Sequence, residues 1–156
     1  MSTDRHRAGR WGPTLLIASA FLLYFLMTRQ AAAPPGWGND FDAAMREAAV
    51  SGKNVVVAFH SAACSPCMAM ERTVLRSDVV RKALDNFVPV RVDVTHPSES
   101  AARYLVEGTP TYLVLSPTWR LLGRTDGYQS EEAMLRFLQV AGTAPSPITS
   151  PSASVP

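Results

Sequence analysis

Residues 55–71 read Val-Val-Val-Ala-Phe-His-Ser-Ala-Ala-Cys-Ser-Pro-Cys-Met-Ala-Met-Glu, and this stretch decides the fold. The β-branched and aromatic residues at its start predict a buried strand, and the Met, Ala and Glu residues at its end favour a helix. Cys64 and Cys67 therefore lie where a strand passes into a helix. Pro66 falls in the first helical turn, where a backbone N–H is not needed.

This position of the cysteine pair favours redox chemistry. Backbone N–H groups and the helix dipole at a helix start stabilise a thiolate, so we expect Cys64 to be the nucleophile. Cys67 lies one turn further into the helix and would resolve a mixed disulfide by attacking Cys64. The alternative of two buried structural thiols remains open at this point.

Metal binding is a weaker interpretation of the same residues. A closed zinc site needs four ligands, and only His6, His60 and His96 could join the two cysteines. Cu(I) delivery would use the cysteines with Met68 or Met70 as soft ligands. We therefore expect no metal and no small-molecule cofactor, and a redox-active Cys64–Cys67 disulfide in their place.

The N-terminus predicts a membrane anchor. Residues 1–10 carry three arginines, and the eighteen uncharged residues 11–28 would span about 27 Å as a helix. The positive flank places residues 1–10 in the cytoplasm and the rest of the chain outside it, which in a bacterium is the periplasmic side of the inner membrane. A signal peptide cleaved after Ala33 is the alternative, but Pro34 would follow the cut.

The rest of the chain divides into a linker, a domain and a tail. Residues 29–38 are rich in Ala, Pro and Gly and predict a linker, and residues 143–156, rich in Pro, Ser and Thr, predict a disordered tail. Between them, residues 39–142 form one α/β domain, with early parallel strands and a late antiparallel hairpin. The expected helices are 41–50, 64–73, 79–86, 101–106 and 131–141, and the expected strands are 54–60, 87–94, 112–115 and 120–124.

Two motifs together resemble the thioredoxin fold, a central mixed sheet flanked by helices. They are Cys64-Ser65-Pro66-Cys67 after a hydrophobic strand and Gly108-Thr109-Pro110-Thr111 before a later strand. The resemblance implies that Pro110 is cis and packs beside the cysteines. It also implies that the backbone of Thr109 and Pro110 pairs with an incoming peptide.

Within that superfamily, residues 70–74, 78–84 and 92–95 resemble in order the C-terminal domain of DsbD-type thiol:disulfide interchange proteins. The resemblance implies electron transfer to exported protein disulfides. The chain departs from thioredoxins at Ala58, where they carry a buried Asp. It also has Ala63 and Met68 where they carry a Trp and a Lys.

Two further residues are candidates for the site. Glu71 lies on the same helix face as Cys67, and DsbD-type domains have a Glu at the matching position. We interpret it as a possible proton acceptor, with a solvated surface acid as the alternative. His60 would stabilise a thiolate if cationic, or would serve as an aromatic-like filler.

These features predict a membrane-anchored periplasmic thiol–disulfide oxidoreductase that reduces the disulfides of exported proteins. The proline in Cys-Ser-Pro-Cys resembles the reducing thioredoxin motif, whereas Thr109 before Pro110 resembles exported isomerases. A disulfide isomerase or oxidase, or a binding or chaperone module without redox turnover, is the alternative. Since one anchor helix cannot relay electrons, we expect a separate membrane or periplasmic donor. The net charge of +2 and the lack of a basic–aromatic patch argue against nucleic acid.

Overall fold

The computed structural model describes residues 17–21 and 33–143, which belong to two compact units, residues 1–32 and 33–156. In the first unit, residues 17–21 are helical. The predicted cytoplasmic segment, the other residues of the predicted span at 11–28 and residues 144–156 of the predicted tail lie outside the described residues. Within the described ranges, no helix is long and apolar enough to cross a membrane.

The second unit is built on a four-stranded mixed sheet with the order β2-β1-β3-β4. Its strands are β1 (Asn54–His60), β2 (Phe87–Asp93), β3 (Thr111–Leu115) and β4 (Leu121–Asp126). β1 pairs with β2 in parallel and with β3 antiparallel, and β3 pairs with β4 antiparallel. The predicted parallel early pair and late hairpin are therefore confirmed.

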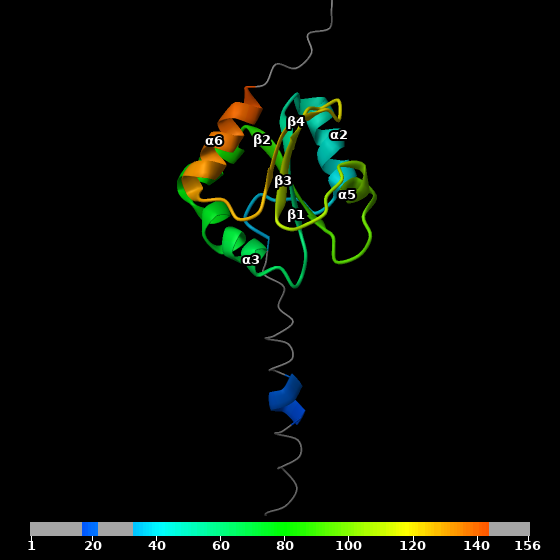
Figure 1. Cartoon of the computed structure of the whole chain (residues 1–156), viewed down its shortest axis with the longest axis vertical. Helices are drawn as coiled ribbons and strands as arrows, with labels where there is room; N and C mark the ends of the chain where they lie inside the picture. Colours follow the sequence, from blue (N-terminus) through cyan, green and yellow to red (C-terminus); the bar gives the residue numbers. More distant parts are fainter. Residues whose placement is uncertain (1–16, 22–32, 144–156) are drawn as a thin grey trace, which may run out of the picture. The chain divides into compact units, whose positions relative to one another are not determined.

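Helices cover both faces of this sheet. They are α2 (Phe41–Ser51), α3 (Ser65–Arg72), α4 (Asp78–Leu84), α5 (Glu99–Arg103) and α6 (Glu131–Gly142), with the 3₁₀ turn η1 (Val74–Arg76) after α3. Because side chains alternate along a strand, β1 contributes Val56 and Ala58 to the core under α3, α4 and α6. Val55, Val57 and Phe59 enter the core under α2 and α5. Figure 1 shows these two layers of helices on opposite sides of the sheet.

The starts of α2, α5 and α6 are fixed by side-chain caps. Asp40, Ser98 and Ser130 each accept a hydrogen bond from the backbone N–H three residues later. The end of α5 differs from the prediction, because the helix stops at Arg103 rather than at residue 106. Leu105 is left-handed, with φ of 51°, and the Val106 N–H donates to the Ala101 carbonyl. This geometry is a Schellman motif with leucine at the position that usually holds glycine.

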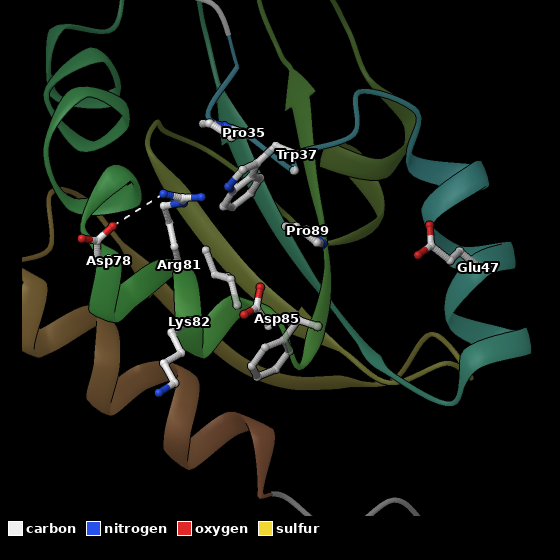
Figure 2. A pocket seen from close by; sticks show the side chains of 11 residues that line it. Pro35, Trp37, Glu47, Asp78, Arg81, Lys82, Asp85 and Pro89 are labelled. Atoms are coloured by element: carbon white, nitrogen blue, oxygen red, sulfur yellow. Dashed lines mark ion pairs between the residues drawn. The ribbon is translucent and has the colours of Figure 1, made fainter.

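The segment before α2 packs on the domain, although its composition predicted a linker. Trp37 is buried in the core with α4, and Gly38 forms a parallel bridge with Val90. The bridge pairs part of the outer edge of β2, which would otherwise be open. Trp37 and Pro89 also line an open pocket of about 570 Å³ with charged residues of α4, including Arg81 (Figure 2). Neither cysteine lines this pocket.

Candidate redox site

The two cysteines form a disulfide where β1 passes into α3. The S–S distance is 2.01 Å, and the Cys64 and Cys67 Cα atoms are 5.2 Å apart. Cys64 is the N-cap of α3, and its Sγ accepts a hydrogen bond from the Cys67 backbone N–H at 3.1 Å. Pro66 lies in the first turn. The predicted placement at a helix start is confirmed, and Cys64 sulfur lies at the partially positive end of the helix.

The loop before β3 approaches the cysteine motif. The Thr109–Pro110 peptide bond is cis, as the resemblance implied. The Thr109 hydroxyl lies 3.4 Å from that of Ser61, whose carbonyl accepts the Cys64 backbone N–H. Thr109 and Ser61 also line an open pocket of about 570 Å³, together with His96. The motif loop, the cis-proline loop and this pocket therefore form one connected region.

A hydroxyl behind the cis-proline loop helps to hold it. Thr111 is buried, and its Oγ1 lies 2.9 Å from the Gly108 carbonyl and 2.6 Å from Asp126 Oδ1. A hydrogen bond from Arg124, and to a smaller extent one from Thr111, lowers the pKa of Asp126. β4 therefore supports the loop through a carboxylate that stays ionised. Gly127 adds a backbone hydrogen bond to the Pro110 carbonyl at 2.7 Å.

Glu71 is buried on the inner face of α3, the helix that carries the cysteines, and is not a solvated surface acid. Its side chain is 8% exposed, and its Oε1 lies 2.8 Å from Arg91 Nη2. Burial raises the pKa of Glu71. The charge of the Arg91 guanidinium, and to a smaller extent that of Arg76, acts to lower it. Since Cys67 and Glu71 are four residues apart on α3 and both are buried, they share the inner face of the helix.

Arg91 is the site residue that the sequence reasoning missed. Its side chain is 11% exposed, and its Nη2 lies 3.5 Å from His60 Nδ1 as well as contacting Glu71. Ala58 lies between Arg91 and Tyr112 in the register of the sheet. The available signal was a charged residue between Val90 and Val92 in a predicted strand, since a charge that is buried there requires a partner.

His60 is partly buried at the end of β1. Burial, followed by the charge of Arg91, lowers its pKa, and Asp93 opposes this effect. A histidine with a lowered pKa is neutral at pH 7. His60 therefore fits the interpretation as an aromatic-like filler and not the expectation of a cationic neighbour for the thiolate.

Met70, one of the two methionines of the motif helix, belongs to the core. Met70 is fully buried in the core, and its Sδ accepts a hydrogen bond from the Gln129 backbone N–H. In the part of the chain that the structure describes, no three His, Cys, Asp or Glu side chains come together in a way that could hold a metal ion.

Comparisons with known proteins agree with this geometry. Residues 36–117 match the profile of the thioredoxin-like family. A thioredoxin from Thermus thermophilus has 35% identity and a TM-score of 0.62, over 66% of this chain and 83% of that one. The oxidised C-terminal domain of Neisseria meningitidis DsbD has 21% identity and a TM-score of 0.58, over 66% and 97%. A putative disulphide-isomerase from Bacteroides thetaiotaomicron has 21% identity and a TM-score of 0.60, over 74% and 100%. No curated protein matches the chain.

Proposed function

Because this chain belongs to the thioredoxin-like family, we propose that it is a thiol–disulfide oxidoreductase that reduces protein disulfides. The observation that carries the proposal is the Cys64–Cys67 disulfide at the start of α3. The cis Thr109–Pro110 loop, linked to the motif through Ser61, supports it.

The reaction transfers two electrons from the cysteine pair to the substrate. The Cys64 thiolate attacks a substrate disulfide, so that the substrate S–S bond breaks and a Cys64–substrate disulfide forms. The departing substrate sulfur leaves as a thiolate and takes up a proton. Cys67 then attacks the Cys64 sulfur, which forms the intramolecular disulfide seen here and releases the second substrate thiol.

Glu71 is the proposed proton acceptor for the second step. Cys67 must lose its proton before it attacks, because the thiolate is the reactive species. Glu71 shares the buried face of α3 with Cys67, one helical turn away. The position of Ala58, where thioredoxins carry an aspartate, holds no ionisable group, so the carboxylate comes from the helix and not from the strand.

The proposed substrates are disulfides of exported proteins. An extended substrate segment would pair with the backbone at Thr109 and Pro110, beside the pocket that Thr109 lines. The apolar residues 11–28 and the preceding arginines support an inner-membrane anchor with the domain in the periplasm. A separate membrane or periplasmic donor would return electrons to the cysteine pair after each turnover.

The reduction potential of the Cys64–Cys67 couple tests the direction of electron flow. We expect a value of about −270 mV, as in thioredoxin, when the full-length chain is equilibrated with dithiothreitol or glutathione buffers. A value of about −120 to −180 mV would favour an oxidase or isomerase instead. Cys64→Ser should abolish reduction of a protein disulfide in the same buffers. Retention of biological activity by this variant would favour a binding or chaperone module.

A further inference from the structure

We propose that Arg91 is a positioning residue for this chemistry, which holds the Glu71 carboxylate ionised beneath the cysteine helix while Cys67 resolves the mixed disulfide. The inference rests on the proposed function and assigns a role to a residue of β2 that lies outside both sequence motifs. It predicts that loss of Arg91 slows resolution and leaves the initial attack by Cys64 intact.

The geometry places Arg91 directly opposite the acid. The inner face of α3 carries Cys67, Met70 and Glu71, all of them buried. Arg91 reaches this face from the sheet, and its Nη2 lies 2.8 Å from Glu71 Oε1. Ala58, its register partner on β1, has a side chain of only one methyl group. The neighbouring strand therefore leaves space on this face of the sheet for the guanidinium.

Charge explains why the acid needs this arginine. A buried carboxyl without a cation becomes neutral because desolvation penalises its charged form. Among the groups that act to lower the pKa of Glu71, Arg91 has the largest effect, through its charge and its hydrogen bond. Arg76 has a smaller effect, and its Nε donates to the Glu71 backbone carbonyl at 3.1 Å.

The other ionisable groups on this face cannot replace Arg91. Burial and the charge of Glu71 raise the pKa of Tyr112, so its hydroxyl stays protonated and uncharged at neutral pH. His60, on β1, has a lowered pKa and is neutral at pH 7. The ion pair with Glu71 holds the guanidinium of Arg91 at this position, although its Nε is buried without a hydrogen-bond partner among the described residues.

Resolution of the mixed disulfide couples one proton transfer to the exchange of one disulfide bond for another. The Cys67 thiol gives its proton to the Glu71 carboxylate, and the Cys67 sulfur forms a bond to Cys64. The bond between Cys64 and the substrate sulfur breaks, and its electron pair leaves on the substrate sulfur. The proton that Glu71 accepted then leaves for solvent or for that sulfur. If Arg91 were absent, burial would raise the pKa of Glu71 with less opposition, and less of the acid would be in the carboxylate form that accepts the proton.

Reaction of the reduced full-length chain with dithionitrobenzoate separates the two steps. Attack by Cys64 releases the first thionitrobenzoate, and resolution by Cys67 releases the second. At reagent concentrations that make the first release fast, the second is observed alone. We would compare Arg91→Met and Arg91→Lys with Glu71→Gln and the double variant Arg91→Met/Glu71→Gln. Arg81→Met, an arginine in an exposed pair with Asp78, is the matched control.

Arg91→Met should slow the second release by about tenfold or more at pH 7 and move its pH profile upward, with the first release changed by less than about twofold. Arg91→Lys should recover most of the rate, and Arg81→Met should behave as wild type. The double variant should be no slower than Glu71→Gln, because both changes remove one function. Arg91→Met leaves the buried Glu71 charge without its partner and so risks failure to fold. The double variant removes both charges and avoids this risk.

Two results would overturn the assignment. One is a rate of the second thionitrobenzoate release in Arg91→Met that lies within about twofold of the wild-type rate. The other is a double variant whose loss of rate is the sum of the losses in the two single variants, in free-energy terms. Failure of the proposed function would look different, because the wild-type chain would then fail to reduce a protein disulfide, or its couple would be oxidising.

Discussion

His60 contributes to stability in a way that depends on pH. In the unfolded chain a histidine titrates near pH 6.5, whereas burial and Arg91 lower the pKa of His60 in the folded domain. Between these two pKa values the unfolded state binds more protons, so stability contributed by neutral His60 is present above about pH 6.5 and is lost as the pH falls through this window.

His60→Phe should remove this component while keeping an aromatic ring at the end of β1. We expect the variant to lose less stability than wild type between about pH 7.5 and pH 5.5, as measured by urea unfolding. His96→Phe, on an exposed loop, is the control for removal of a histidine. An equal loss in His60→Phe and wild type would show that His60 does not carry the effect.

Single residues also show where sequence reasoning stopped. Cys64 and Cys67 follow from a local motif, and the cis bond before Pro110 follows from the family resemblance; the structure places all three in one region. Arg91 could not be found in this way. Its partner Glu71 lies twenty positions away on α3, and the parallel pairing of β1 with β2 brings Arg91 to the inner face of that helix.

At the scale of elements, the end of α5 has a defined energetic weakness. Leu105 holds a left-handed conformation, with φ of 51°, and its side chain is exposed. This conformation costs a residue with a Cβ about 1 kcal/mol, a cost that glycine avoids. Leu105→Gly should therefore stabilise the domain by about 1 kcal/mol in urea unfolding, and the dependence of the unfolding free energy on urea concentration should not change. Leu105→Ala, which removes the side chain but keeps Cβ, should give no such gain.

Elements were predictable where the signal was local. Runs of β-branched and aromatic residues predicted the strands, and the side chains of Asp40, Ser98 and Ser130 cap the starts of α2, α5 and α6. The end of α5 was misplaced because leucine, and not glycine, holds the left-handed position at 105, so no local stop signal marks the turn. The contact of Trp37 with the core was hidden by the surrounding Ala, Pro and Gly residues, since composition does not show which side chain finds a partner.

At the scale of the whole molecule, the sheet order brings the site together from separate parts of the chain. β1 supplies the motif, β3 supplies the cis-proline loop, and the edge strand β2 supplies Arg91. In the proposed cycle, the one cysteine pair gives up two electrons to the substrate and then receives two from the proposed separate donor. A mixed disulfide with a partner is therefore an obligatory intermediate on each side of the proposed cycle.

Blocking resolution should accumulate that intermediate in cells. Cys67→Ser keeps the attacking thiol of Cys64 but cannot release the partner, so it should accumulate mixed disulfides that a reductant cleaves. Cys64→Ser should form few of them, because it lacks the thiol at the helix start. The measurement is non-reducing gel electrophoresis after acid quenching, and the captured proteins are identified by mass spectrometry. Capture of exported proteins is the expected result. Equal capture by the two variants, or capture of cytoplasmic proteins alone, would contradict the proposed attack by Cys64 or the proposed periplasmic location.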